Sequence, residues 1–147
     1  MIRDFAATAD DAKVETCIIG SGPAGLAAAH DLALEGYDPV IYEAMPRAGG
    51  MLASGIPDYR LPPDVLDAEV KDILSMGVEL KLNAPIGKSG LTLADLRKNH
   101  DAVFIGVGAQ LGKALDIPGE DLQGYIHAVD FLRMVNLSQP VKIGKRV

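Results

Sequence analysis

Residues 20–25 read Gly-Ser-Gly-Pro-Ala-Gly and stand between an apolar run at 14–19 and an alanine-rich run at 26–34. A Gly-x-Gly-x-x-Gly pattern between a predicted strand and a predicted helix is typical of a dinucleotide-binding turn. In such a turn Gly20 permits the tight bend, Gly22 lets a pyrophosphate approach the backbone, and Gly25 lets the helix lie close to the sheet. We therefore expect a pyrophosphate at the positive end of this helix.

A second predicted strand follows the helix and ends in an acid. Gly36 is placed to end the helix, and residues 40–43 read Val-Ile-Tyr-Glu. Glu43 follows Gly25 at close to the spacing of about 20 residues expected for a carboxylate that binds the adenosine ribose hydroxyls. The alternative is an ordinary βαβ unit whose glycines serve only as turns, but several independent features of the motif agree here.

Strands and helices alternate along the rest of the chain. Residues 1–13 are predicted to be a polar linker or arm, and 141–147 the start of a further, truncated strand. The pattern predicts strands at 14–19, 40–43, 78–82 and 102–107, and helices at 23–34, 62–76, 92–99 and 127–135. Thr92 is the expected cap of the third helix, and 44–63 is expected to be a long loop.

This alternation predicts an α/β fold with a parallel sheet and helices on both faces. The continuous apolar run at 102–107 is typical of a buried parallel strand. Ligands of such sheets bind at the carboxyl ends of the strands. Gly20, Glu43 and residues 106–109 follow three predicted strands, so we expect them to converge on one site.

Composition excludes several classes of protein. The 147 residues suit one domain, and a net charge of −6 argues against a general nucleic-acid partner. No apolar run approaches the ~18 residues of a membrane span. Cys17 is the single cysteine, which excludes an internal disulfide, a redox dithiol and a cysteine-ligated iron–sulfur cluster in this chain and favours the cytoplasm. The three histidines have no metal-ligand spacing, so no metal site is expected.

Residues after Glu43 bear on which dinucleotide is bound. FAD and the nicotinamide dinucleotides share an ADP half, so the glycine turn and Glu43 fit both. Arg47 can meet a phosphate or cover the adenine face. The pair at 49–50 gives backbone N–H groups access to the middle of a long, extended cofactor, and together these features favour FAD.

Six segments then carry a family resemblance: 18–28, 43–52, 55–62 (Gly-Ile-Pro-Asp-Tyr-Arg-Leu-Pro), 101–109, 117–122 and 128–132. On these segments the chain resembles the FAD-binding part of the glutamate synthase small (beta) subunit and related NAD(P)H-dependent flavin reductases, such as the electron-input half of dihydropyrimidine dehydrogenase. Residues 3–6 are similar to the linker that precedes the flavin domain in that family. The segment at 55–62 is specific to this group among FAD folds.

The resemblance implies a Rossmann-like FAD-binding domain over 14–140, in which FAD accepts hydride from NAD(P)H and passes electrons singly to iron–sulfur clusters of a neighbouring domain or large subunit. It assigns the pyrophosphate to Gly20, Gly22, Pro23, Ala24 and Gly25. It places the adenosine ribose at Glu43, beside Ala44, and the length of the cofactor at Arg47, Gly50, Met51 and Leu52. Arg60 or Ile56 would lie nearer the flavin, and Gly108 and Ala109 match a second strand end that contacts FAD.

Two departures from the family pattern stand out. The family has Ala-Thr-Gly where this chain has Gly106-Val107-Gly108, which removes one hydroxyl contact. The family's second glycine motif for NAD(P)H, its C-terminal return segment and its upstream cysteine-rich domain have no counterpart, so we expect a portion truncated before the NAD(P)H-binding domain. No catalytic side chain is expected, because the cofactor performs the chemistry. The alternatives are a nicotinamide-binding Rossmann domain of a dehydrogenase and a non-catalytic docking module.

Overall fold

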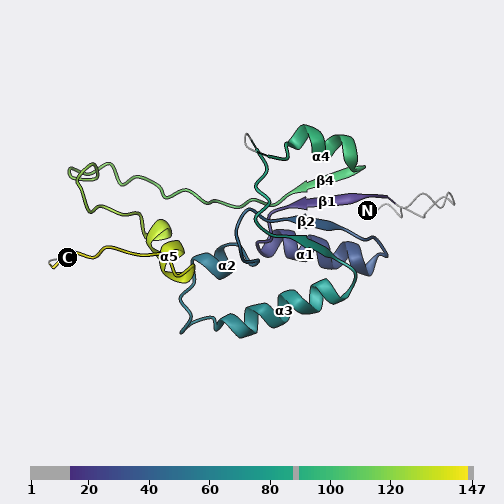
Figure 1. The fold of residues 1–147 in the computed structure, drawn as a ribbon, viewed down its shortest axis with the longest axis horizontal. Coiled ribbons are helices and arrows are strands. Elements are labelled where there is room, and N and C mark those ends of the chain that lie inside the picture. The colour runs from purple at the N-terminus through teal and green to yellow at the C-terminus, as the bar shows by residue number, and fades with distance from the viewer. Residues whose placement is uncertain (1–13, 88–89, 146–147) are drawn as a thin grey trace, which may run out of the picture.

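A parallel four-stranded sheet forms the centre of the computed structural model, which describes residues 14–87 and 90–145. Its strands are β1 (Thr16–Ile19), β2 (Val40–Tyr42), β3 (Glu79–Lys81) and β4 (Ala102–Ile105), in the order β3-β2-β1-β4 (Figure 1). Ile18 lies between Ile41 on one side and Phe104 on the other. The predicted parallel sheet is confirmed.

Helices cover both faces of this sheet, as predicted. Helices α1 (Pro23–Leu34) and α3 (Pro63–Ser75) lie on one face, and α4 (Leu93–Asn99) lies on the other (Figure 1). Successive strand residues point to opposite faces, so Ile18 and Ile41 pack in the cluster of α1 and α3, whereas Cys17 packs with Leu96 of α4. Two apolar layers therefore fix the carboxyl ends of the strands relative to α1.

The cap predicted at the start of α4 is present. Thr92 Oγ1 accepts a hydrogen bond from the Asp95 backbone N–H, and the Asp95 carboxylate accepts from the Thr92 N–H and hydroxyl. This reciprocal pair is a capping box. The hydrogen bonds from the Thr92 hydroxyl and N–H lower the pKa of Asp95.

Two short helices lie beyond the carboxyl edge of the sheet. Helix α2 (Met51–Ser54) falls inside the predicted loop at 44–63, and α5 (Ala128–Asn136) matches the predicted last helix. A single turn is too short to show helical periodicity in a sequence, which is why α2 was not predicted. The Asn136 amide donates to the carbonyl oxygens of Ala53 (3.3 Å) and Ile56 (3.0 Å), which joins α5 to the end of α2.

One prediction about a strand was wrong. The run at 102–107 was expected to be buried, but β4 is an edge strand in which Phe104 is 42% and Ile105 57% exposed. The start of a truncated strand expected at 141–147 stays a prediction, and residues 141–145 have irregular structure here. Residues 146–147 and the predicted arm at 1–13 lie outside the described residues.

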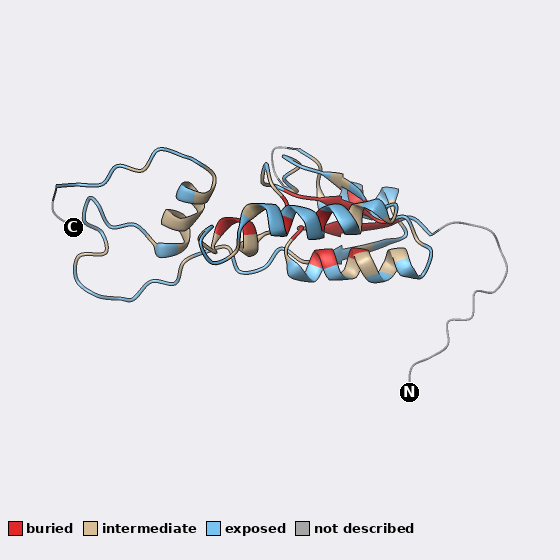
Figure 2. Cartoon of the chain, turned by 90° about the horizontal axis from the view of Figure 1, so that it is seen from below, coloured by how far each residue is buried: buried red, intermediate tan, exposed pale blue. Residues whose placement is uncertain are grey.

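Exposure divides the described chain into two parts. Buried residues gather in the sheet and in the helices packed on it, whereas the segment from 106 to 127 runs outward and is largely exposed (Figure 2). Within the described ranges, no helix has the length and apolarity needed to cross a bilayer.

Candidate functional site

A cleft of about 720 Å³ opens at the carboxyl ends of β1, β2 and β4. Ten of the predicted site residues line it: Gly20, Gly22, Pro23, Ala24, Glu43, Ala44, Gly50, Met51, Gly108 and Ala109. The convergence expected from the parallel topology is therefore present. Glu43 is the one charged residue among the lining residues that the structure describes.

The start of α1 forms the floor of the cleft. Gly22 is the N-cap residue, and none of the described side chains caps the helix there. The first-turn N–H groups of a helix have no intrahelical partner and carry the positive end of its dipole. A Cβ at Gly22 would have the Gly50 Cα, at 4.0 Å, as its nearest neighbour. The absence of a side chain at Gly22 thus leaves space directly in front of an uncapped helix terminus.

Gly25 serves packing rather than the cleft surface. It is buried and does not line the cleft, and a Cβ there would lie 1.9 Å from the Gly20 carbonyl oxygen. Gly106 packs into the same junction, because a Cβ at Gly20 would lie 2.6 Å from the Gly106 oxygen. These three glycines bring the ends of β1 and β4 into backbone contact with α1, as the motif predicts for Gly25.

Glu43 is held on the cleft wall by three donors. Glu43 is only 6% exposed. Its Oε2 accepts hydrogen bonds from the Ser21 N–H (2.8 Å) and the Ser21 hydroxyl (2.6 Å). Oε1 accepts from the Met45 N–H at 2.8 Å. A buried carboxylate needs such donors in place of water. The arrangement supplies a fixed acceptor close to the helix terminus.

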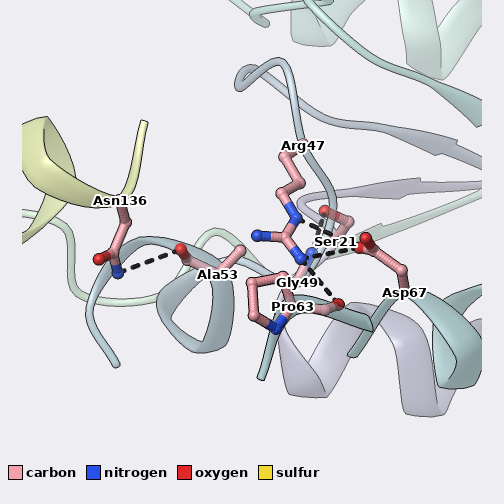
Figure 3. A network of polar contacts seen from close by, with 7 residues as sticks. All are labelled: Ser21, Arg47, Gly49, Ala53, Pro63, Asp67 and Asn136. Atoms are coloured by element: carbon pink, nitrogen blue, oxygen red, sulfur yellow. Dashed lines mark hydrogen bonds and ion pairs between the residues drawn. The ribbon is translucent and has the colours of Figure 1, made fainter. Parts of the chain in front are cut away.

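The glycine pair at 49–50 packs directly on the glycine turn. The Gly49 N–H donates to the Ser21 carbonyl (3.0 Å) and hydroxyl (3.2 Å), and Figure 3 draws these two residues together. Gly50 has φ of +54°, and a Cβ there would lie 2.7 Å from the Gly22 Cα. Only a glycine fits this approach, which positions Gly50 and Met51 on the cleft wall opposite Gly22.

The structure places the remaining predicted residues away from the cleft lining. Arg47 points toward α3, where its guanidinium donates to Asp67 (2.9 Å) and to the Pro63 carbonyl (2.9 Å) (Figure 3). Leu52 packs against the core, and Arg60 is exposed. Ile56 offers its carbonyl to Asn136. The prediction that Arg47 lies along a cofactor stays a prediction, and in this structure its side chain is paired within the protein.

Several lining residues were missed from the sequence. They end or follow the strands, or belong to α2: Ile19, Tyr42, Met45, Ala84, Pro85, Ile86, Ile105, Gln110 and Ser54. Gly106 and Val107 also line the cleft, within the segment 106–109 that was expected there. Most of the missed residues are apolar and carry no motif. The rule that ligands bind at the carboxyl ends of parallel strands could have found residues 84–86, because they follow β3.

Three comparisons with known proteins agree with this geometry. Residues 18–68 match the family described as NAD(P)-binding Rossmann-like domain. The chain resembles the nucleotide-binding part of oxidoreductase subunits. It is 46% identical over 134 residues to the NADP(+)-dependent formate dehydrogenase subunit beta of Moorella thermoacetica. The aligned region is 90% of this chain and 19% of that protein.

The second relative bears on the family predicted from the sequence. Glutamate synthase [NADH] of Schizosaccharomyces pombe is 41% identical over 116 residues, which are 78% of this chain and 6% of that protein. This match confirms the resemblance to the glutamate synthase group. The chain spans less than a third of the length of the curated relatives it matches.

A solved structure shares the fold. Mycobacterium tuberculosis FprA in complex with NADPH superimposes with a TM-score of 0.75 at 28% identity, over 84% of this chain and 29% of that chain. The Rossmann-like architecture and the partial coverage are thus seen in sequence and in structure. Among the described residues, no group of three or more His, Cys, Asp or Glu side chains is arranged to hold a metal ion.

Proposed function

We propose that this chain binds FAD in the cleft and is the FAD-binding portion of an NAD(P)H-dependent flavoprotein oxidoreductase. The observation that carries the proposal is the pairing of an uncapped helix terminus, open in front of Gly22, with a fixed carboxylate at Glu43 on the same cleft. A dinucleotide with an ADP half needs both: backbone donors for its diphosphate and an acceptor for its ribose hydroxyls.

Each wall of the cleft suits one part of that ligand. The first-turn N–H groups of α1 would hold the diphosphate, and Glu43 would accept from the adenosine ribose. The apolar surface formed by Met45 and residues 84–86 suits the adenine ring. Gly50 and residues 106–110 line the rest of the cleft, where backbone approaches an extended ligand closely.

Charge favours an adenosine ribose without a 2′-phosphate. Sites for NADP carry an arginine near the 2′-phosphate, whereas an acid at this position selects the free hydroxyl. Among the described lining residues the one charged side chain is that of the acid Glu43, and Arg47 is paired with Asp67 outside the lining. FAD and NAD(H) both have the free hydroxyl. The match to a family described as NAD(P)-binding keeps NAD(H) as the second candidate for this cleft.

The chemistry would come from the cofactor and the rest of a larger enzyme. Bound FAD supplies hydride acceptance from NAD(P)H and single-electron transfer onward. The residues of this chain bind the cofactor, orient it and exclude water from its ADP half. We further propose an iron–sulfur domain or a large subunit as the electron-accepting partner, and the cytoplasm as the compartment, since Cys17 is a free thiol.

Ligand titration of the purified chain tests the proposal. FAD, NAD(+) and NADP(+) are each added, and binding is followed by flavin fluorescence or by calorimetry. The proposal predicts the tightest binding for FAD and the weakest for NADP(+), with no useful NADPH oxidation by residues 1–147 alone. Tight NAD(+) binding with no FAD binding would establish the second candidate instead, and robust NADPH turnover would contradict the assignment to an incomplete portion.

A further inference from the structure

Ser21 carries the one polar side chain of the glycine turn at residues 20–25. It is 0% exposed, and its hydroxyl donates to Glu43 Oε2 at 2.6 Å. Its backbone N–H donates to the same oxygen at 2.8 Å. The residue at this place in the motif is a variable x, so the pattern alone gives it no role. The structure makes Ser21 the residue that connects the glycine turn to the Glu43 carboxylate.

The bonds at Glu43 leave one acceptor position for a ligand. A carboxylate has about four lone-pair positions, two on each oxygen. Ser21 fills both positions on Oε2, and the Met45 N–H fills one on Oε1. These are the donors that the described part of the chain supplies to the carboxylate, so the remaining position is on Oε1. Glu43 lines the cleft, so this position is available to a ligand hydroxyl.

We propose that Ser21 is a positioning residue whose hydroxyl fixes Oε2 of Glu43, so that Oε1 is presented to a hydroxyl of the adenosine ribose. This inference rests on the proposed binding of a dinucleotide in the cleft. The Ser21 hydroxyl acts through Glu43 and does not itself contact the ligand.

The surrounding bonds make this role separable from a general structural one. The Gly49 N–H also donates to the Ser21 carbonyl, so replacing Ser21 with alanine leaves that donor satisfied. The Ser21 N–H still donates to Oε2 in that variant, because it belongs to the backbone. The substitution therefore removes one short, charge-assisted bond that orients the carboxylate, a kind of bond stronger than a neutral one.

The test compares wild type and Ser21→Ala, each titrated by calorimetry with a ligand that has the ribose hydroxyls and with one that lacks them. The protein is the 147-residue chain. The probes are ADP and 2′,3′-dideoxy-ADP, which lacks both hydroxyls. The proposal predicts that Ser21→Ala weakens ADP about tenfold and dideoxy-ADP less than about twofold. Ser75→Ala is the matched control, because the Ser75 hydroxyl donates to the exposed Asp72 carbonyl on α3, away from the cleft lining. It should change neither affinity.

The outcomes distinguish failure of the positioning role of Ser21 from failure of the proposed dinucleotide binding. Equal losses for both probes would overturn the positioning role, and so would an unchanged ADP affinity. Ser21→Thr retains the hydroxyl and should retain the preference for ADP over dideoxy-ADP; loss of that preference in a folded Ser21→Thr protein would also overturn it. This second variant keeps the test valid if Ser21→Ala does not fold. If the wild-type chain binds neither ADP nor FAD, the proposed function fails and this inference fails with it.

Discussion

Substitutions at Gly22 and Gly25 should have separate effects: the first should weaken ligand binding and the second should lower the stability of the fold. At Gly22 the backbone has φ of −70° and ψ of −179°, which any residue adopts, and a Cβ meets nothing closer than 4.0 Å. Gly22→Val should therefore change the free energy of unfolding by no more than about 1 kcal/mol. Its methyl groups enter the space in front of α1, where the diphosphate would lie.

The expected loss of affinity follows from the bonds that the valine displaces. A phosphate on a helix terminus needs N–H···O distances of about 2.9 Å. A branched side chain at Gly22 prevents this approach, and the loss of two bonds to a charged group costs about 3 kcal/mol or more. That corresponds to more than about a hundredfold in the dissociation constant for FAD.

Gly25→Ala should have the opposite effect. Its Cβ would lie 1.9 Å from the Gly20 carbonyl oxygen, so α1 must shift by more than about 1 Å to reach an ordinary contact distance. Forcing backbone apart in a packed junction costs about 3 kcal/mol, which lowers the melting temperature by about 10 °C in a domain of this size.

Thermal melts followed by circular dichroism, with FAD titrations on each folded variant, measure both effects. The reasoning would be refuted if Gly22→Val bound FAD as tightly as the wild type, or if Gly25→Ala melted at the wild-type temperature. In the first result the space in front of α1 would not be the diphosphate site. In the second, the close approach at Gly25 would carry no energetic weight.

Four further results are expected. Glu43→Ala should weaken FAD binding at least tenfold and destabilise the fold by about 2 kcal/mol by orphaning the Ser21 donors; unchanged affinity in a titration would contradict this. Arg47→Ala should leave FAD affinity within twofold and cost less than about 1 kcal/mol in a melt, because its partner Asp67 is exposed; a large loss of affinity would place the arginine on the ligand after all. Asn136→Ala should speed amide exchange in α5, because the Asn136 amide joins α5 to the end of α2. Unchanged exchange would mean that these two hydrogen bonds do not hold α5 in place. The pKa of Asp95 is lowered in the folded protein, so the stability that its cap gives α4 is complete above the ordinary aspartate pKa and is lost as the pH falls through the lowered pKa. Amide exchange in α4, measured across that pH range, should show this loss in the wild type and not in Asp95→Ala.

The sequence predicted the features that obey local rules. The glycine turn, the span of α1 and the Thr92 cap each follow from short-range requirements of backbone geometry, and all three are present. The convergence of Gly20, Glu43 and residues 106–109 follows from the rule for parallel sheets, and the cleft confirms it.

The features that the sequence could not decide depend on tertiary partners. Arg47 has no local signal that separates a ligand contact from an ion pair with Asp67, 20 residues along the chain. The apolar composition of β4 predicted burial, but burial requires a neighbour on its second edge, and β1 is the neighbour that the described sheet provides. The proposed positioning role of Ser21 depends on its contacts with Glu43 and Gly49, which lie 22 and 28 residues away in the sequence.

A crystal structure of this chain grown with saturating FAD would examine the proposed site itself. The account predicts density for the diphosphate against the first turn of α1, in front of Gly22, with an adenosine ribose hydroxyl on Glu43 Oε1. A cleft that remains empty at saturating FAD, or a nucleotide bound with its diphosphate away from Gly22, would contradict it.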